Sequence, residues 1–232
     1  MTDPLKSKPW LPYVAPFAIY MAFLFVQTNE NLLWAYPLKT VAVAVALWWF
    51  RSSFTELRSR MICRASGPLA AGANPTAAGE PPALRVWLLD VVVGLVAIAI
   101  WIGIDPFYPK PTKASSFDPS GQWLFIAFRV VGAVVVVPVM EELFWRAFLI
   151  RWIDNPDFKR VPVGTFSWKS FALTVVLFGV EHNEWLAGMI CGALYNWLLY
   201  RTRSVFACVV AHATSNAALA AWVLARGDWK FW

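Results

Sequence analysis

Charged side chains are scarce in this 232-residue sequence, where Asp, Glu, Lys and Arg together make up 15%. Soluble proteins carry about 25%, so the shortage excludes an ordinary soluble domain. Apolar residues make up 59% of the chain, and there are 15 tryptophans, a residue enriched at membrane–water interfaces. With a mean hydropathy of +0.54, the composition predicts an all-α fold: a polytopic transmembrane helical bundle forming one integral membrane domain over residues 1–232.

Cysteine is also rare. Cys63, Cys191 and Cys208 are an odd number with no close pair, which excludes a disulfide framework and a C-x-x-C metal knuckle. The sequence lacks H-E-x-x-H, the helical motif of one large class of zinc peptidases. No small-residue cleavage site follows the first apolar run, so we expect that run to be a retained helix and not a signal peptide.

Apolar runs predict about seven membrane spans, because a hydrocarbon core of about 30 Å needs about 20 apolar residues. We place them at residues 10–28, 32–50, 85–104, 121–153, 170–182, 185–200 and 204–225. The fourth is too long for a simple span, so we expect it to tilt, to kink at Pro138 or to lie partly in the interface. Residues 51–83 are rich in Gly, Ala and Pro, which predicts a flexible cytoplasmic loop.

The basic residues predict the orientation of the bundle. Seven spans put thirteen Lys and Arg residues on the side of the N-terminus and the 51–83 loop, against four on the other side. Cytoplasmic loops carry such an excess, so we predict a cytoplasmic N-terminus and an outer C-terminus. The same bias explains the net charge of +6 without a nucleic-acid partner; the expected partner is the lipid bilayer.

Polar residues inside the predicted spans gather at one depth. Counted from the cytoplasmic ends at about 1.5 Å per residue, Glu141 lies roughly 16 Å deep and His182 roughly 20 Å deep. On the last span, His212 and Asn216 lie roughly 12 and 18 Å deep and share one helix face. These two histidines are the only ones in the chain. The agreement in depth predicts one site near the membrane midplane.

The residue types in this set fit hydrolysis. A Glu and a His can activate a water molecule as a general base, and a second His with an Asn amide can donate hydrogen bonds to an oxyanion. Alternatively, Glu141, His182 and His212 could hold a divalent metal such as zinc, which would activate the water.

Several of these residues also have structural interpretations. Glu142 and Arg146 can form an i,i+4 ion pair that serves stability alone, and membrane histidines often bond to a neighbouring helix. Glu181 would point about 100° away from His182 on a helix, either as a partner of the site or toward another helix. We interpret Lys39 and Arg129 as structural. Gly188 and Gly192 form G-x-x-x-G, which predicts a close helix contact.

Three motifs together resemble a known family, the CAAX-processing and bacteriocin-processing (Abi, type II CAAX prenyl protease) intramembrane endopeptidases. The family pattern places E-E-x-x-x-R, F-x-x-x-H and H-x-x-x-N or H-x-x-x-D on three membrane helices. Here they read EELFWR from Glu141, FGVEH from Phe178 and HATSN from His212. The resemblance covers residues 121–220, a protease core. The chain also resembles the CAAX-protease-related proteins of bacterial exosortase systems.

The resemblance implies an endopeptidase of the bacterial inner membrane, with a site that opens toward the cytoplasm. Glu141 would be the general base and His182 would help to activate the water. His212 and Asn216 would stabilise the oxyanion, while Glu142 and Arg146 would order the site. A glutamate mechanism and a zinc mechanism both stay open. The implied substrate is a prenylated CAAX protein or another membrane-anchored protein or peptide.

Two other functions are compatible with a polytopic bundle of this kind. One is a non-catalytic immunity or scaffold protein, against which the intact Glu, His, His and Asn set argues. The other is a proton-coupled transporter, in which membrane-embedded Glu and His relay protons. Transporters are often built from two related halves, and the sequence has no such repeat. Composition does not indicate an oligomeric state.

Overall fold

The computed structural model describes residues 8–57, 82–111 and 117–231, and within them it is helical, with no strand. The all-α prediction is therefore confirmed. Seven helices follow the predicted order. They are α2 (Leu11–Val26), α3 (Leu32–Trp49), α5 (Pro82–Ile104), a continuous helix over Trp123–Trp152, α9 (Trp168–Val180), α10 (Trp185–Thr202) and α11 (Val205–Arg226). Most of the predicted 51–83 loop lies outside the described residues.

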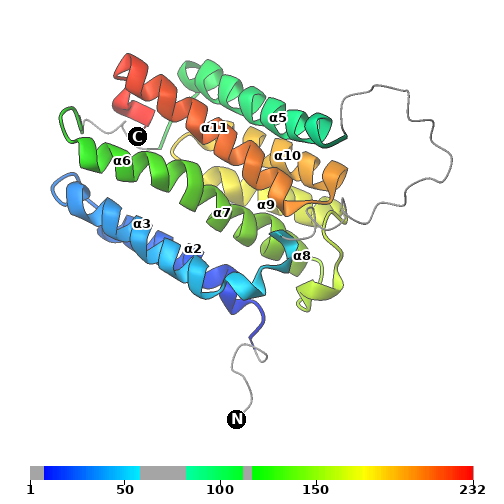
Figure 1. The fold of residues 1–232 in the computed structure, drawn as a ribbon. Helices are drawn as coiled ribbons and strands as arrows, with labels where there is room; N and C mark the ends of the chain where they lie inside the picture. The colour runs from blue at the N-terminus through cyan, green and yellow to red at the C-terminus, as the bar shows by residue number, and fades with distance from the viewer. Residues whose placement is uncertain (1–7, 58–81, 112–116, 232) are drawn as a thin grey trace, which may run out of the picture.

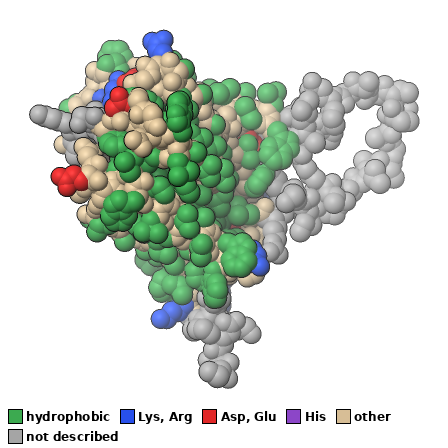
Figure 2. All heavy atoms as spheres, turned by 60° about the vertical axis from the view of Figure 1, so that its left-hand side comes forward, with side chains coloured by type: hydrophobic (Ala, Val, Ile, Leu, Met, Phe, Trp, Pro, Cys, Tyr) green, Lys and Arg blue, Asp and Glu red, His purple; other side chains and the backbone are tan. Residues whose placement is uncertain are grey.

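Four of these helices are long and apolar enough to cross a membrane. They are Leu32–Trp49, Trp87–Phe107, Trp123–Trp152 and Val205–Arg226, while α2 and α9 are shorter apolar helices. Large apolar side chains make up much of the face shown in Figure 2, and among the exposed apolar residues of the bundle Phe25 is 86% and Trp49 is 69% exposed. An apolar surface of this extent is stable in lipid and costly in water. The chain is thus an integral membrane protein.

The helix over Trp123–Trp152 passes through the middle of the bundle. It consists of α6 (Trp123–Val131), a π-helical stretch (Gly132–Val136), α7 (Val137–Glu142), a second π-helical stretch (Leu143–Leu149) and α8 (Ile150–Trp152). Figure 1 shows α2 and α3 on one side of it and α5, α10 and α11 on the other. Proline cannot donate the backbone hydrogen bond of a regular α-helix, and the first π-helical stretch ends just before Pro138.

Glycines let the helices behind the site approach closely. A Cβ at Gly94 of α5 would lie 2.3 Å from the carbonyl oxygen of Ala211 in α11. A Cβ at Gly188 would lie 3.1 Å from Cα of Gly179, and one at Gly192 would lie 3.2 Å from the Phe178 ring. The predicted contact through the G-x-x-x-G glycines is confirmed: α10 uses them to pack on α9.

The two ends of the bundle differ. The turn between α2 and α3, the start of α6 and the end of α11 lie at the left in Figure 1, and α8 lies at the right. At the α8 end, the buried guanidinium of Arg151 pairs with the buried carboxylate of Glu56 at 2.5 Å. The hydroxyl of Tyr13 donates to the same carboxylate at 2.8 Å. This cluster ties residues 51–57 to the central helix.

Replacing Arg151 by Met should destabilise the protein, because it removes the buried guanidinium that binds the Glu56 carboxylate. Loss of one partner of a buried ion pair typically costs about 3–5 kcal/mol. The double variant Arg151→Met/Glu56→Gln should regain most of the lost unfolding temperature, measured in detergent by tryptophan fluorescence.

Arg160 provides the matched control at the same end, because its pair with Asp157 is exposed. Arg160→Met should change the free energy of unfolding by less than about 1 kcal/mol. Equal loss of stability in Arg151→Met and Arg160→Met would contradict the assignment of the Glu56–Arg151 pair as the structural tie.

Candidate active site

The structure brings the four residues predicted for the site to one cavity of about 460 Å³: Glu141, His182, His212 and Asn216 all line it. A volume of this size is typical of sites for small molecules or peptide side chains. Glu141 comes from α7, while His212 and Asn216 come from α11. His182 follows the end of α9 at Val180, so the prediction of a helix ending at residue 182 was wrong by two residues.

Glu142 lies beneath the cavity and is fully buried together with Arg146. The Arg146 guanidinium donates to Glu142 Oε1 at 3.1 Å, to Asn196 Oδ1 at 3.2 Å and to the Gly192 carbonyl at 3.3 Å. The amide of Asn196 in turn donates to Thr174 Oγ1 at 2.9 Å. The predicted i,i+4 ion pair is present, and a hydrogen-bonded network extends it to α9 and α10.

Glu142 has a second partner that its own helix does not supply. His212 Nδ1 lies 2.9 Å from Glu142 Oε1, and a carboxylate held by a guanidinium acts as an acceptor, so Nδ1 carries the proton. The other ring nitrogen, Nε2, then faces Glu141, whose Oε2 is 4.0 Å away. The purely structural interpretation of Glu142 was therefore incomplete, because Glu142 also orients the imidazole of His212.

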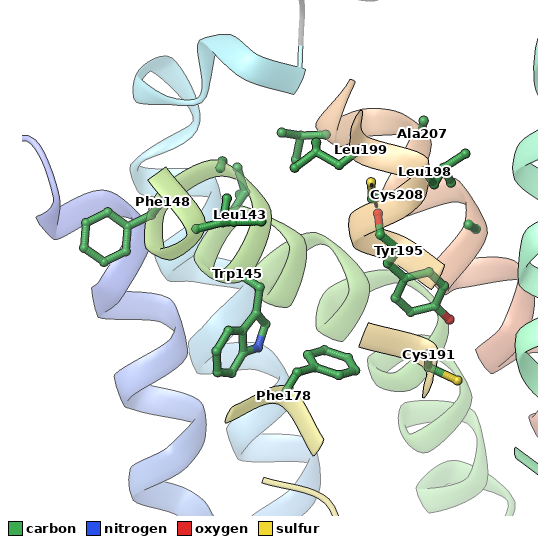
Figure 3. Packing of buried hydrophobic residues seen from close by; sticks show 14 of the residues in the cluster. Leu143, Trp145, Phe148, Phe178, Cys191, Tyr195, Leu198, Leu199, Ala207 and Cys208 are labelled. Atoms are coloured by element: carbon green, nitrogen blue, oxygen red, sulfur yellow. Dashed lines mark hydrogen bonds between the residues drawn. The ribbon is translucent and has the colours of Figure 1, made fainter. Parts of the chain in front are cut away.

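Aromatic and hydroxyl groups hold His212 from its other sides. The Tyr195 ring stacks on the imidazole with the two centroids 5.2 Å apart. The Tyr195 hydroxyl lies 2.7 Å from Ser215 Oγ, and Ser215 Oγ donates to the His212 carbonyl at 2.8 Å. Figure 3 shows Tyr195 among the buried side chains, with Phe178 and Trp145 pointing toward each other nearby. A ring packed in this way has one orientation available.

His182 is oriented by the last turn of the helix that precedes it, α9. Its Nδ1 lies 2.7 Å from the Phe178 carbonyl oxygen, which can only accept a hydrogen bond, so Nδ1 carries the proton. The Trp101 ring meets the imidazole edge to face at 5.4 Å. The remaining nitrogen, Nε2, is thus an unprotonated base that can accept a proton or bind a metal.

Asn216 makes a contact that its predicted role did not include. Its amide nitrogen donates to the Ala133 carbonyl at 2.8 Å. Ala133 belongs to the first π-helical stretch. One amide hydrogen thereby ties α11 to the central helix, and the second remains for a ligand in the cavity.

The sequence left the role of Glu181 open between a partner of the site and a residue that faces another helix. Ligand atoms of Glu141, Glu181 and His182 lie within 4.8 Å of one another, and His212 is not in that group. The Trp145 indole donates to Glu181 Oε1 at 3.1 Å. The 100° spacing of neighbouring helical residues does not apply here, because α9 ends at Val180. In the turn that follows, Glu181 and His182 can face the same site.

Lys39 and Arg129, which we interpreted as structural, also line the cavity. Both cations lie over the ring of Tyr36, with Lys39 Nζ 4.5 Å and Arg129 Cζ 4.7 Å from its centroid. Lys39 Nζ lies over the Tyr20 ring as well, at 4.4 Å. Aromatic faces stabilise buried cations, which accounts for Lys39 inside the bundle.

Comparison with known families identifies the part of the chain that carries these residues. Residues 122–218 match the family model described as type II CAAX prenyl endopeptidase, Rce1-like. This segment is similar to that family. The Rce1-like segment contains Glu141, His182, His212 and Asn216, while α2, α3 and α5 lie outside it and complete the cavity wall. No curated protein and no solved structure matches the chain.

The hydrogen bonds of the Rce1-like segment predict the tautomers of both histidines. In its neutral form, each ring should carry its proton on Nδ1. Nitrogen NMR of protein labelled in histidine tests this directly, since only two residues contribute and a His182→Gln variant assigns them.

The Glu142→Gln variant should change the tautomer of one histidine and leave that of the other unchanged. The Gln amide can donate to His212 Nδ1, so His212 should shift to the Nε2–H tautomer while His182 keeps Nδ1–H. Nε2–H tautomers for both histidines in the unmodified protein would contradict the orientation described for the site.

Proposed function

We propose that this protein is an intramembrane endopeptidase that hydrolyses a peptide bond of a membrane-anchored or lipidated substrate with water activated by Glu141. One observation carries the proposal. Glu141 is 4% exposed, it faces the cavity beside both histidines, and its Oε2 has no hydrogen-bond partner. A buried carboxylate oxygen without a partner is costly, and a water molecule held for reaction would satisfy it.

In the proposed reaction Glu141 takes a proton from the water as the water attacks the scissile carbonyl carbon. The 4.0 Å between Glu141 Oε2 and His212 Nε2 exceeds a direct hydrogen bond and suits one bridging water. His182 Nε2 is a second base beside Glu141, which supports its proposed help in activation. The free amide hydrogen of Asn216 would donate to the oxyanion, and Glu141 would then pass its proton to the leaving amine.

The chain also has side chains that fit a zinc ion. Glu141, Glu181 and His182 supply two carboxylates and a neutral imidazole, a donor set that zinc accepts while keeping one position open. Bound there, zinc would polarise the substrate carbonyl and lower the pKa of a bound water. We propose this group, in which Glu181 takes the place of His212 in the set suggested by the sequence. The metal content of the purified protein before and after a chelator, compared with Glu181→Gln, discriminates zinc from a glutamate mechanism.

We place the protein in the inner membrane of a bacterium, in line with the resemblance. The substrate class follows from the position of the site. A cavity inside a bundle with a lipid-facing apolar surface receives segments that are already held at the membrane. A prenylated CAAX protein and a membrane-anchored peptide both satisfy that condition.

Glu141→Gln should abolish cleavage without unfolding the protein. Loss of a general base typically lowers kcat by about 10²–10⁴-fold. The assay is cleavage of a farnesylated CAAX peptide, and of a non-prenylated membrane-anchored peptide, by purified protein in liposomes.

Glu30→Gln is the matched control, because Glu30 lies exposed in the turn between α2 and α3, and it should cleave like the unmodified protein. Retained cleavage in Glu141→Gln would rule out the proposed base. No cleavage of either peptide by the unmodified protein would favour a non-catalytic role.

A further inference from the structure

The cavity has its mouth at one end of the bundle. Its wall reaches the turn between α2 and α3 through Gln27, Thr28 and Asn29, and Thr28 and Asn29 are exposed. It also includes Glu184, just before α10, and Phe231, just after α11. All of these segments lie at the end where α2 stops and α3 starts, because consecutive helices of the bundle alternate in direction.

Nothing in the cavity wall comes from the opposite end. Within the described residues, no lining residue belongs to 47–57, to 142–177 or to 196–211. The space below the site is filled by buried side chains such as Leu143, Leu198 and Cys208 (Figure 3). The Glu56–Arg151 cluster lies beyond them. Water and substrate therefore reach Glu141 from the mouth end.

Ion pairs and a hydrogen bond hold together the segments that surround the mouth. Lys110 and Lys230 both bind the carboxylate of Asp105, at 2.9 and 3.0 Å. This links the turn after α5 to the short helix Trp229–Phe231, which places Phe231 on the wall. The Trp185 indole donates to the Pro109 carbonyl at 3.0 Å. Three segments that are distant in sequence are thus joined around the opening.

The charge bias assigns the two ends to opposite sides of the membrane. Basic residues crowd the closed end, where those within the described ranges are Lys8, Arg51, Arg85, Arg151, Lys159, Arg160, Lys169, Arg201 and Arg203. The mouth end has only Lys110, Arg226 and Lys230 among the described residues. An excess of Lys and Arg marks the cytoplasmic side, so the closed end faces the cytoplasm.

We propose that the cavity opens on the non-cytoplasmic side of the membrane and that the substrate presents its scissile bond from that side. The opening is opposite to the cytoplasmic one that the family resemblance implies. The substrate class narrows accordingly to a translocated protein or peptide that is anchored in the membrane and exposes its cleavage site outside. This last step rests on the proposed endopeptidase function, whereas the direction of the opening does not.

Single cysteines test the direction of the opening without any catalysis. Cys208 is buried and Cys191 lines the cavity, so the parent chain carries Cys63→Ser and Cys191→Ser, and its labelling gives the background. Asn29→Cys marks the mouth and Ser52→Cys marks the closed end; both positions are exposed. Leu219→Cys lines the cavity on α11, and Ala217→Cys is its matched control on the outer face of the same helix.

The probe is a small membrane-impermeant cationic thiol reagent, applied to sealed right-side-out and inside-out vesicles. We expect Asn29→Cys and Leu219→Cys to react at least tenfold faster in right-side-out vesicles, and Ser52→Cys to react at least tenfold faster in inside-out vesicles. Ala217→Cys should react in neither. The reverse pattern for Asn29→Cys and Ser52→Cys, or faster reaction of Leu219→Cys from the inside, would overturn the proposal.

A second measurement connects the opening to cleavage. Coupling a bulky impermeant maleimide to Asn29→Cys from the outer side should lower cleavage of a membrane-anchored peptide at least tenfold, and coupling to Ser52→Cys should leave it unchanged. Unimpaired cleavage after coupling at Asn29→Cys would overturn entry through this mouth. Outer labelling without cleavage in the unblocked protein would instead contradict the endopeptidase function alone.

Discussion

The burial of Glu142 with Arg146 is the constraint on which the rest of this structure depends. Both side chains are almost completely removed from solvent, and a guanidinium in an apolar interior needs partners for each of its donors. One carboxylate cannot supply them. The remaining acceptors are Asn196 Oδ1 and the Gly192 carbonyl of α10, so this helix must pack against the central one. The small size of Gly192 keeps the Phe178 ring of α9 in place beside it.

The same ion pair sets up the chemistry above it. Because Arg146 keeps Glu142 as an acceptor, Glu142 can orient His212, and the second nitrogen of His212 then faces Glu141. Neighbouring carboxylates on one helix point about 100° apart. One therefore faces the network in the core and the other faces the cavity. The structural carboxylate and the proposed reactive one are adjacent in sequence for this reason.

Access to the site follows from how the bundle is filled. Large side chains close the space below Glu141, and polar turns surround the space above it. One end of the cavity is open, while the other is sealed by the core and by the Glu56–Arg151 pair. The two ends of the bundle thus differ in packing, and Lys and Arg are more numerous at the closed end than at the open one.

The amino-acid sequence by itself determined the helices and their order, and it predicted a common depth for the polar residues, because apolar run length and helical rise are local properties. The site residues, the Glu142–Arg146 pair and the close contact of α9 with α10 could be predicted from these. Only the tertiary structure decided which side chains share partners across helices. Helix rotation decides that His212 bonds to Glu142 and that Asn216 donates to the Ala133 carbonyl. The residue at which α9 ends decides that Glu181 lies beside Glu141. The direction in which the cavity opens is likewise decided by packing, because it depends on which end of the bundle large side chains fill.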